Sequence, residues 1–154
     1  MTKKWMCVFI LVLLTIDQSL KFFVRTHLKF NEYLSVVPNF LDVTYAINRG
    51  AAFGMLQNQQ WFFILFALIT ILVLVYLIKF KNFNNKLFLA SSILLISGGI
   101  DNLIDRVYLG YVVDYMKFSF FTTVCNFADI CIVAGTVLLG GYILFYHKSS
   151  KIRS

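Results

Sequence analysis

Four stretches of the chain are apolar and long enough to cross a membrane as helices. The hydrocarbon core of a bilayer is about 30 Å thick and needs roughly 20 predominantly apolar residues in a helix. Such stretches cover about residues 5–24, 61–78, 87–106 and 126–146. The second stretch has no charged residue, and the other three carry charges near one end. The pattern predicts an all-α integral membrane protein, a four-helix transmembrane bundle that forms a single domain over residues 1–154.

The composition excludes an ordinary soluble domain. The chain is 60% hydrophobic and 14% charged, whereas globular proteins are about 45–50% apolar and about 25% charged. Lys3 and Lys4 before the first apolar stretch resemble the start of a signal peptide. However, no small-x-small cleavage site follows, and Asp17-Gln18 stand where one is expected. We therefore interpret the first stretch as a retained helix.

The charges are divided unevenly between the two sides of the predicted membrane. One side holds eight cations and no carboxylate: Lys3, Lys4, Lys79, Lys81, Lys86, Lys148, Lys151 and Arg153. The other six cations share the rest of the chain with all seven acids. Because cytoplasmic loops carry an excess of Lys and Arg, we expect both termini and the loop at residues 79–86 in the cytoplasm. The net charge of +7 then sets orientation, and no nucleic-acid partner is predicted.

Two outer segments connect the spans on the opposite side. Residues 25–60 are too polar to span, and their stretch from Tyr33 to Ala46 mixes β-branched and aromatic residues around a proline. This composition indicates short strands lying on the membrane surface. We interpret residues 107–123 as a second loop whose phenylalanines, Phe118, Phe120 and Phe121, dip into the membrane interface.

Five of the seven carboxylates fall at one depth, in the outer leaflet: Asp17, Asp101, Asp105, Asp114 and Asp129. A charged side chain at the centre of a membrane helix costs about 2.5–3.5 kcal/mol on insertion scales, so such residues are candidates for function. Asp17 and Lys21 are four residues apart and can pair on one helical face. That pair is either part of a site or a structural ion pair near a helix end.

Uncharged and cationic groups accompany these acids. Arg106 is free to point toward Asp101, Asp114 or a substrate carbonyl. The asparagines at the same depth are Asn48, Asn102 and Asn126. Each is either a site residue or a cap or turn residue, and Asn126 is placed to cap the fourth span.

Asp114 and Asp129 are embedded among apolar neighbours. Two carboxylates in one partly desolvated site do not both ionise readily, so one of them holds a proton that the other lacks. That arrangement can activate water against an amide, with one carboxylate as base and its partner as acid. A proton or ion relay remains the alternative.

Other chemistries have weaker support in the sequence. The three cysteines show no CxxC or Cys/His metal spacing, so we interpret them as small packing residues, and both histidines as bystanders. Asp101, Asp105 and Asp114 resemble in outline a Mg²⁺-holding set for lipid-headgroup transfer. A small transporter and a structural subunit are further alternatives; the first needs acids at several depths, and the second leaves the five carboxylates unexplained.

The motifs resemble those of the lipoprotein signal peptidases, the signal peptidase II family. In chain order they are Asp17-Gln18-x-x-Lys21, Asn48-Arg49-Gly50-Ala51-Ala52-Phe53-Gly54, Gly98 to Arg106 (GGIDNLIDR), Val112-Val113-Asp114 and Asn126-Phe127-Ala128-Asp129. Each motif is short, but five in order on a four-span chain are specific. The resemblance implies a four-helix bundle with a small extracytoplasmic β-cradle and a flexible outer helix over the active site.

The resemblance also implies an activity: cleavage of a diacylglyceryl-modified prolipoprotein just before its lipidated cysteine, at the outer face of a bacterial cell membrane. The catalytic pair would be Asp114 and Asp129, without metal or cofactor. Substrate-binding and supporting residues would be Asn48, Asn102, Arg106, Asn126, Asp17 and Lys21. In these roles Asn102 and Asn126 orient the carboxylates, Arg106 and the outer-loop asparagine hold substrate carbonyls, and the first-span pair supports the site. We expect a monomer whose partners are its substrate and membrane lipid.

Three residues depart from the family's usual pattern. Asp101 and Ser97 stand where glycine is usual, and Cys125 replaces a common phenylalanine. Asp101 matters most because it adds a carboxylate beside the catalytic pair. We expect it to pair with Arg106 or to alter substrate fit, and thus to affect efficiency and inhibitor response rather than reaction class.

Overall fold

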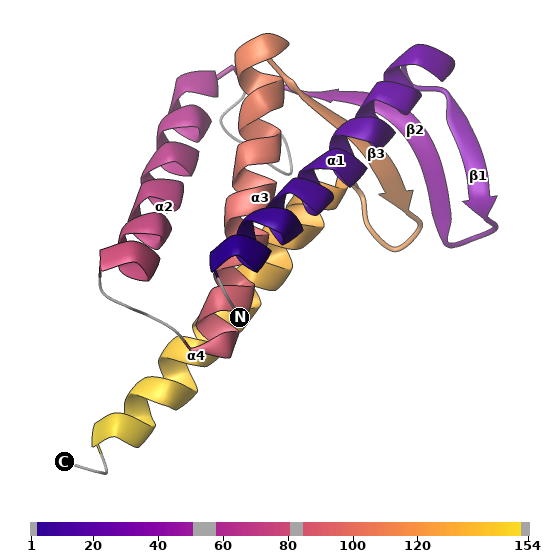
Figure 1. Ribbon diagram of the computed structural model, residues 1–154. Coiled ribbons are helices and arrows are strands. Elements are labelled where there is room, and N and C mark those ends of the chain that lie inside the picture. The colour runs from indigo at the N-terminus through magenta and orange to yellow at the C-terminus, as the bar shows by residue number, and fades with distance from the viewer. Residues whose placement is uncertain (1–2, 51–57, 81–84, 152–154) are drawn as a thin grey trace.

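The computed structural model describes residues 3–50, 58–80 and 85–151, and within them the chain forms four long helices and a small sheet (Figure 1). The helices are α1 (Lys3–His27), α2 (Gln60–Phe80), α3 (Lys86–Tyr108) and α4 (Phe127–Lys151), and the strands are β1 (Tyr33–Val37), β2 (Leu41–Asn48), β3 (Val112–Phe118) and β4 (Val124–Cys125). Each helix contains a segment long and apolar enough to cross a membrane. The four predicted spans are therefore confirmed as helices, with ends that differ by a few residues.

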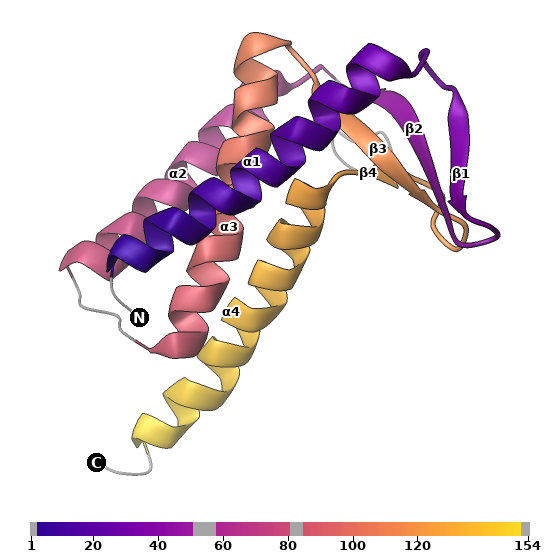
Figure 2. The ribbon, with the colours of Figure 1, turned by 45° about the vertical axis from the view of Figure 1, so that its right-hand side comes forward.

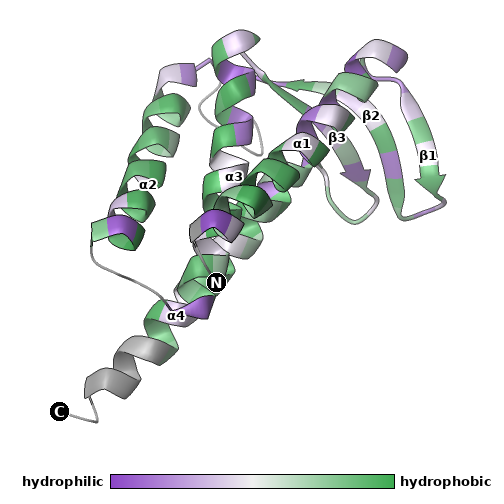
Figure 3. Ribbon diagram, viewed as in Figure 1, coloured by the Kyte–Doolittle hydropathy of each residue, from purple (hydrophilic) through white to green (hydrophobic). Residues whose placement is uncertain are grey.

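Helix α3 is the centre of the bundle and packs against the other three helices (Figures 1 and 2). Its buried apolar side chains meet Met6 of α1 and Leu74 and Ile78 of α2 in one core cluster. The outer faces of the bundle are apolar as well. Helix α2 is hydrophobic along nearly its whole length in Figure 3, and most of its large side chains are exposed. Apolar surfaces of this extent are suited to contact with lipid.

The first turn of α4 lies very close to α3 because of a glycine. A Cβ atom added to Gly98 would lie 2.5 Å from the carbonyl oxygen of Ala128. Small residues let helix backbones approach one another in membranes. Gly98 therefore sets the distance between α3 and the start of α4, where the candidate site lies.

The sheet is antiparallel with strand order β1-β2-β3-β4. It lies at the end of the bundle away from the start of α1 and the end of α4 (Figure 2). The strands expected between Tyr33 and Ala46 are confirmed. Our interpretation of residues 107–123 as a loop was wrong, since they contain β3, an inner strand of the sheet. The description all-α thus covers the four helices but not this sheet.

Some predictions fall on residues outside the described ranges. They concern residues 51–54 of the outer-loop motif and the cations Lys81 and Arg153. The outer helix that the resemblance places over the active site is also not among the described residues, which leave out 51–57 between β2 and α2.

Candidate active site

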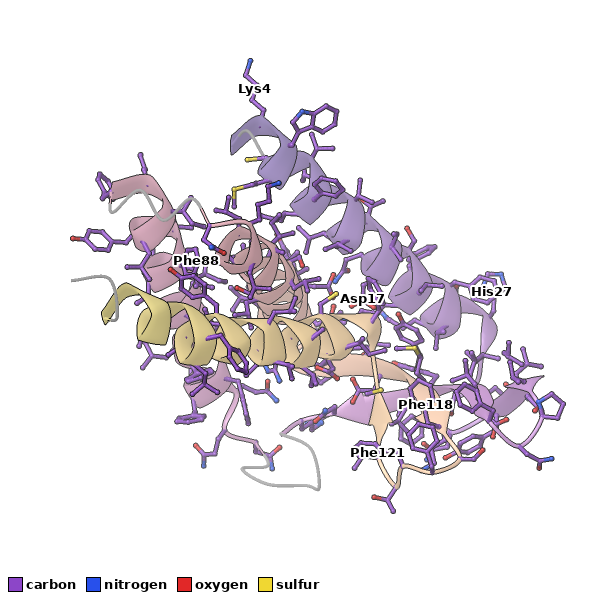
Figure 4. All side chains as sticks on the ribbon, turned by 90° about the horizontal axis from the view of Figure 1, so that it is seen from below. Lys4, Asp17, His27, Phe88, Phe118 and Phe121 are labelled. Atoms are coloured by element: carbon purple, nitrogen blue, oxygen red, sulfur yellow. The ribbon has the colours of Figure 1, made fainter. Side chains whose placement is uncertain are left out.

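Strand β3 places two buried polar residues on opposite faces. Side chains alternate along a strand, so Asp114 and Tyr115 point in opposite directions, and each is 3% exposed. The Tyr115 hydroxyl donates a 2.7 Å hydrogen bond to Oδ1 of Asp17 on α1. Asp17 points from α1 into the bundle (Figure 4). The strand thus separates an Asp17 side of the site from an Asp114 side.

Pairing of β2 with β3 brings Asn48 to Asp114. Ala46 is the direct cross-strand partner of Asp114, which makes Asn48 its diagonal neighbour on the same face. The Asn48 Nδ2 atom donates to Oδ2 of Asp114 at 2.8 Å. The Asn48 oxygen accepts from the backbone N–H of Gly50 at 3.0 Å, which fixes the orientation of the amide.

Asn126 connects Asp114 to the first turn of α4. Its Oδ1 atom accepts from the backbone N–H of Asp129 at 2.8 Å, and its own N–H donates to Oδ2 of Asp129 at 3.3 Å. This reciprocal pair caps the helix, which is one of the two roles that the sequence left open for Asn126. Asp129 lies in the first turn of α4. The Nδ2 atom of Asn126 donates to Oδ1 of Asp114 at 2.8 Å.

Asn102 on α3 holds the other carboxylate oxygen of Asp129. Its Oδ1 atom accepts from Lys21 Nζ at 3.1 Å and from Asn126 Nδ2 at 3.1 Å. Lysine has only donors to offer, so the oxygen of Asn102 must face it. The Asn102 Nδ2 atom then donates to Oδ1 of Asp129 at 2.8 Å.

Lys21 lies among three buried carboxyl groups. Its Nζ atom is 3.1 Å from Oδ2 of Asp17 and 3.1 Å from Oδ2 of Asp105, and it also contacts Oδ2 of Asp101. All four residues are at most 3% exposed. The predicted pairing of Asp17 with Lys21 is confirmed. Asp101 pairs with Lys21 rather than with Arg106, because α1 presents the lysine to this face of α3.

Arg106 lies on the cavity side of α3. Its guanidinium carbon is 4.9 Å from the centre of the Phe63 ring on α2, a cation–π contact. Its Nη1 atom donates to the backbone carbonyl oxygen of Asn102 at 3.3 Å. The buried Nε atom has no hydrogen-bond partner among the described residues. Arg106 also lines the cavity, where its guanidinium group would meet an incoming ligand.

A cavity of about 740 Å³ opens beside the two aspartates. Asn48, Asn102, Arg106 and Asp129 are its polar wall, whereas most of the lining is apolar and includes Phe63, Phe66, Phe118, Phe120 and Phe121. Phe118 and Phe121 lie together at the sheet end of the molecule (Figure 4). Asp129 thus faces the cavity directly, and the buried Asp114 lies behind it.

The cysteines have three different environments. Cys131 is buried, Cys125 is half-buried and lines the cavity, and Cys7 is exposed on α1. The interpretation as packing residues is confirmed for Cys131 and is wrong for Cys7.

The environment of Asp114 favours a proton. Burial raises the pKa of Asp114 to about 7, the nearby charge of Asp129 acts in the same direction, and the hydrogen bonds from Asn48 and Asn126 oppose both. Asn126 donates to both carboxyl groups, through its side chain to Asp114 and through its backbone to Asp129.

The carboxyl groups are not arranged as a metal site. Among the described residues, no group of three or more His, Cys, Asp or Glu side chains could hold a metal ion. Asp101 and Asp105 face the Lys21 ammonium, and Asp114 faces two asparagine amides. The set that resembled a magnesium site is thus divided between two places. Nothing in this donor geometry favours the phosphotransferase alternative.

Sequence reasoning missed two residues of the site. Tyr115 holds Asp17, and Phe63 holds Arg106. Strand alternation next to Asp114 could have indicated Tyr115, had β3 been recognised. Phe63 carried no signal, because it is one phenylalanine among many on an apolar span.

Comparison with known proteins identifies relatives over nearly the whole chain. Residues 9–145 match the family described as Signal peptidase (SPase) II. A lipoprotein signal peptidase of Clostridioides difficile strain 630 is 41% identical over 145 residues, covering 92% of this chain and 96% of its own. One from Caldanaerobacter subterraneus subsp. tengcongensis is 43% identical over 131 residues, covering 84% and 89%.

Solved structures give the same picture of the fold. One bacterial membrane enzyme superposes with a TM-score of 0.87 at 28% identity, covering 99% of this chain and 93% of its own. A second bacterial membrane enzyme superposes with a TM-score of 0.84 at 28% identity, covering 93% and 94%.

Proposed function

The chain belongs to the signal peptidase II family, and on this premise we propose that it is a membrane aspartic endopeptidase acting on diacylglyceryl-modified bacterial prolipoproteins. It removes their signal peptide by cleaving just before the lipidated cysteine. The observation that carries the proposal is the Asn126 bridge, in which one residue holds both Asp114 and Asp129 through its side chain and backbone. Such a bridge keeps two carboxyl groups in a fixed relation beside one cavity.

The pair works by general acid–base catalysis. The ionised carboxylate takes a proton from a water molecule, whose oxygen attacks the carbonyl carbon of the scissile amide. The protonated partner gives its proton to the leaving nitrogen, and the C–N bond breaks. The products are a carboxylic acid on the signal peptide and an amine on the lipidated cysteine. The pair finishes with one proton, as it began.

The remaining polar groups fix the pair and the substrate. Asn102 and Asn126 orient the two carboxylates through N–H donors. Arg106 lines the cavity, and its guanidinium group offers N–H donors to a substrate carbonyl. Asn48 also lines the cavity and is placed to bind a substrate carbonyl. Asp17 and Lys21 support the site from behind.

The cavity suits a lipid-linked peptide. Its lining is mostly apolar, and it lies beside helices whose outer faces are apolar. The cation distribution supports cytoplasmic termini, and the sheet lies at the opposite end of the bundle (Figure 2). We place the site at the outer leaflet, where the acyl chains of the substrate are anchored. A monomer is part of the proposal, because α3 packs against the other three helices in one bundle within a single chain.

Cleavage of a diacylglyceryl-modified lipobox peptide by purified protein in detergent, with a metal chelator present, tests the proposal. We expect turnover by the wild type and a loss of at least about 10²-fold in Asp114→Asn and Asp129→Asn, since each substitution removes one proton-transfer group. Asp42→Asn is the matched control. It removes a carboxylate from β2 outside the site and should leave turnover unchanged.

Two results would contradict the proposal. Turnover that the chelator abolishes, and that added Mg²⁺ restores, would favour the metal enzyme. Full activity in either of the two site variants would show that Asp114 and Asp129 are not the catalytic pair. The peptide without the lipid serves as a second comparison. If the enzyme requires the lipid, it should cleave this peptide much more poorly than the modified one.

A further inference from the structure

Asp101 is a buried carboxyl group that the proposed mechanism does not use. It is 1% exposed and lies on α3 directly before Asn102, which holds Asp129. The inference below rests on the proposed function and concerns what Asp101 adds to it.

The other two carboxylates around Lys21 are well supplied with donors. Asp17 accepts from the Tyr115 hydroxyl at 2.7 Å and from the backbone N–H of Ala128 at 3.2 Å. Asp105 accepts from one side-chain amide at 3.1 Å and from one backbone N–H at 3.0 Å. Each therefore has two donors in addition to the Lys21 ammonium. Such hydrogen bonds stabilise the ionised form of a buried carboxylate.

Asp101 differs from both. Its Oδ2 atom contacts Lys21, whereas its buried Oδ1 atom has no hydrogen-bond partner among the described residues. Titratable groups face it from every neighbouring element, namely Asp17 and Lys21 on α1, Asp105 on α3, Tyr115 on β3 and Cys131 on α4. Three acids thus share one cation in a space closed to water. The Asp101 carboxyl is the one with the fewest donors.

We propose that Asp101 is a positioning residue, whose Oδ1 atom carries a proton toward the Asp17 carboxylate and whose neutral group leaves the Lys21 ammonium on Asn102. A proton on Oδ1 turns a buried acceptor without a donor into a donor beside a carboxylate, and it removes one negative charge from the cluster. Both changes relieve the cost of burying unpaired polar and charged groups.

The link to catalysis runs through Lys21. Its ammonium has three hydrogens and four acceptors in contact, on Asp17, Asp101, Asp105 and Asn102. An ionised Asp101 would compete strongly for these hydrogens, whereas a neutral carboxyl group is a weaker acceptor. A neutral Asp101 therefore leaves one hydrogen for Asn102. That bond keeps the Asn102 oxygen toward Lys21 and its NH₂ group toward Asp129.

Two substitutions at position 101 separate this role from simple packing. Asp101→Asn reproduces a neutral acid, with an oxygen for Lys21 and an N–H for Asp17. We expect its turnover within twofold of the wild type and its pH profile unchanged. Asp101→Leu fills similar space without polar atoms. We expect its kcat to fall about tenfold at nearly unchanged KM, because the substrate cavity is untouched. Ser97→Ala, one turn earlier on α3, is the control and should behave as the wild type.

Infrared spectroscopy measures the proton without relying on activity. The difference spectrum between the wild type and Asp101→Asn should show loss of a carboxylic-acid C=O band, and that between the wild type and Ser97→Ala should not. If the wild type fails to cleave the lipopeptide, the proposed function fails. The presence or absence of this band still shows whether Asp101 carries a proton. The inference is overturned if the band is absent, if Asp101→Asn shifts the pH profile or loses activity as Asp101→Leu does, or if Asp101→Leu is fully active.

Discussion

The Nδ2 atom of Asn126 lies 2.8 Å from Oδ1 of Asp114, and the Oδ1 atom of the same side chain caps α4 at Asp129. One amide therefore joins a strand and a helix that carry the two carboxyl groups. Its geometry depends on the folding of both elements. The relative position of the two carboxyl groups therefore depends on this one side chain.

Replacing Asn126 by alanine should damage both stability and turnover. The loss of a helix cap costs about 0.5–2 kcal/mol, and Asp114 loses the donor that orients it. We expect kcat to fall by about 10²-fold or more, measured with the lipopeptide. Asn85→Ala removes the cap of α3, where Asn85 accepts from Leu87 and Phe88 N–H groups. That control should lose a similar amount of stability and keep its kcat, and an equal loss of kcat in both variants would contradict the bridge.

Asp114→Asn should be inactive yet more stable than the wild type at alkaline pH. Burial, with the charge of Asp129, raises the pKa of Asp114 from 3.8 in the unfolded chain to about 7 in the folded protein. The stability that the neutral group contributes is therefore fully present below pH 3.8 and is lost as the pH rises through about 7. Linkage then predicts that the wild type loses about 3 kcal/mol between pH 5 and pH 8 from this group. Thermal unfolding of both proteins at these pH values should show that the stability advantage of the variant over the wild type grows from pH 5 to pH 8.

Lys21→Met should be severely destabilising. It leaves the buried carboxyl groups of Asp17, Asp101 and Asp105 without their shared cation. Removal of one partner from a buried ion pair costs about 3–5 kcal/mol, so we expect a large drop in the unfolding midpoint. Lys29→Met is the matched control, since Lys29 is exposed and surface changes are usually within about 0.5 kcal/mol. Similar midpoints for the two variants would argue against the cluster.

Gly98→Ala should separate the two helices that hold Asn102 and Asp129. The new Cβ would lie 2.5 Å from the Ala128 oxygen, and overpacking of this kind costs about 1–3 kcal/mol. We expect lower stability and lower kcat together. Gly140→Ala places its Cβ where nothing lies within 4 Å. Its better helix propensity should leave stability equal or up to about 1 kcal/mol higher, without effect on cleavage.

Several features of the fold could be predicted because they depend on nearby residues. Four spans follow from the length of apolar stretches, and the pair of Asp17 with Lys21 follows from helical spacing. The cap at Asn126 follows from its place before an apolar stretch. Strand β3 was missed because its short sequence is recognisable only through its pairing with β2.

The sequence by itself determined which segments cross the membrane and which residue types gather at one depth, because transfer into lipid is close to a sum over single residues. It also determined the family, through five motifs in order. Only the tertiary structure decided which side chains contact one another. Asp101 meets Lys21 rather than Arg106, Tyr115 meets Asp17, and Asn126 holds both members of the pair. The physical reason is that hydrogen bonds require distances near 3 Å between elements far apart in the chain. Those distances are set by packing, above all where Gly98 lets α3 approach α4.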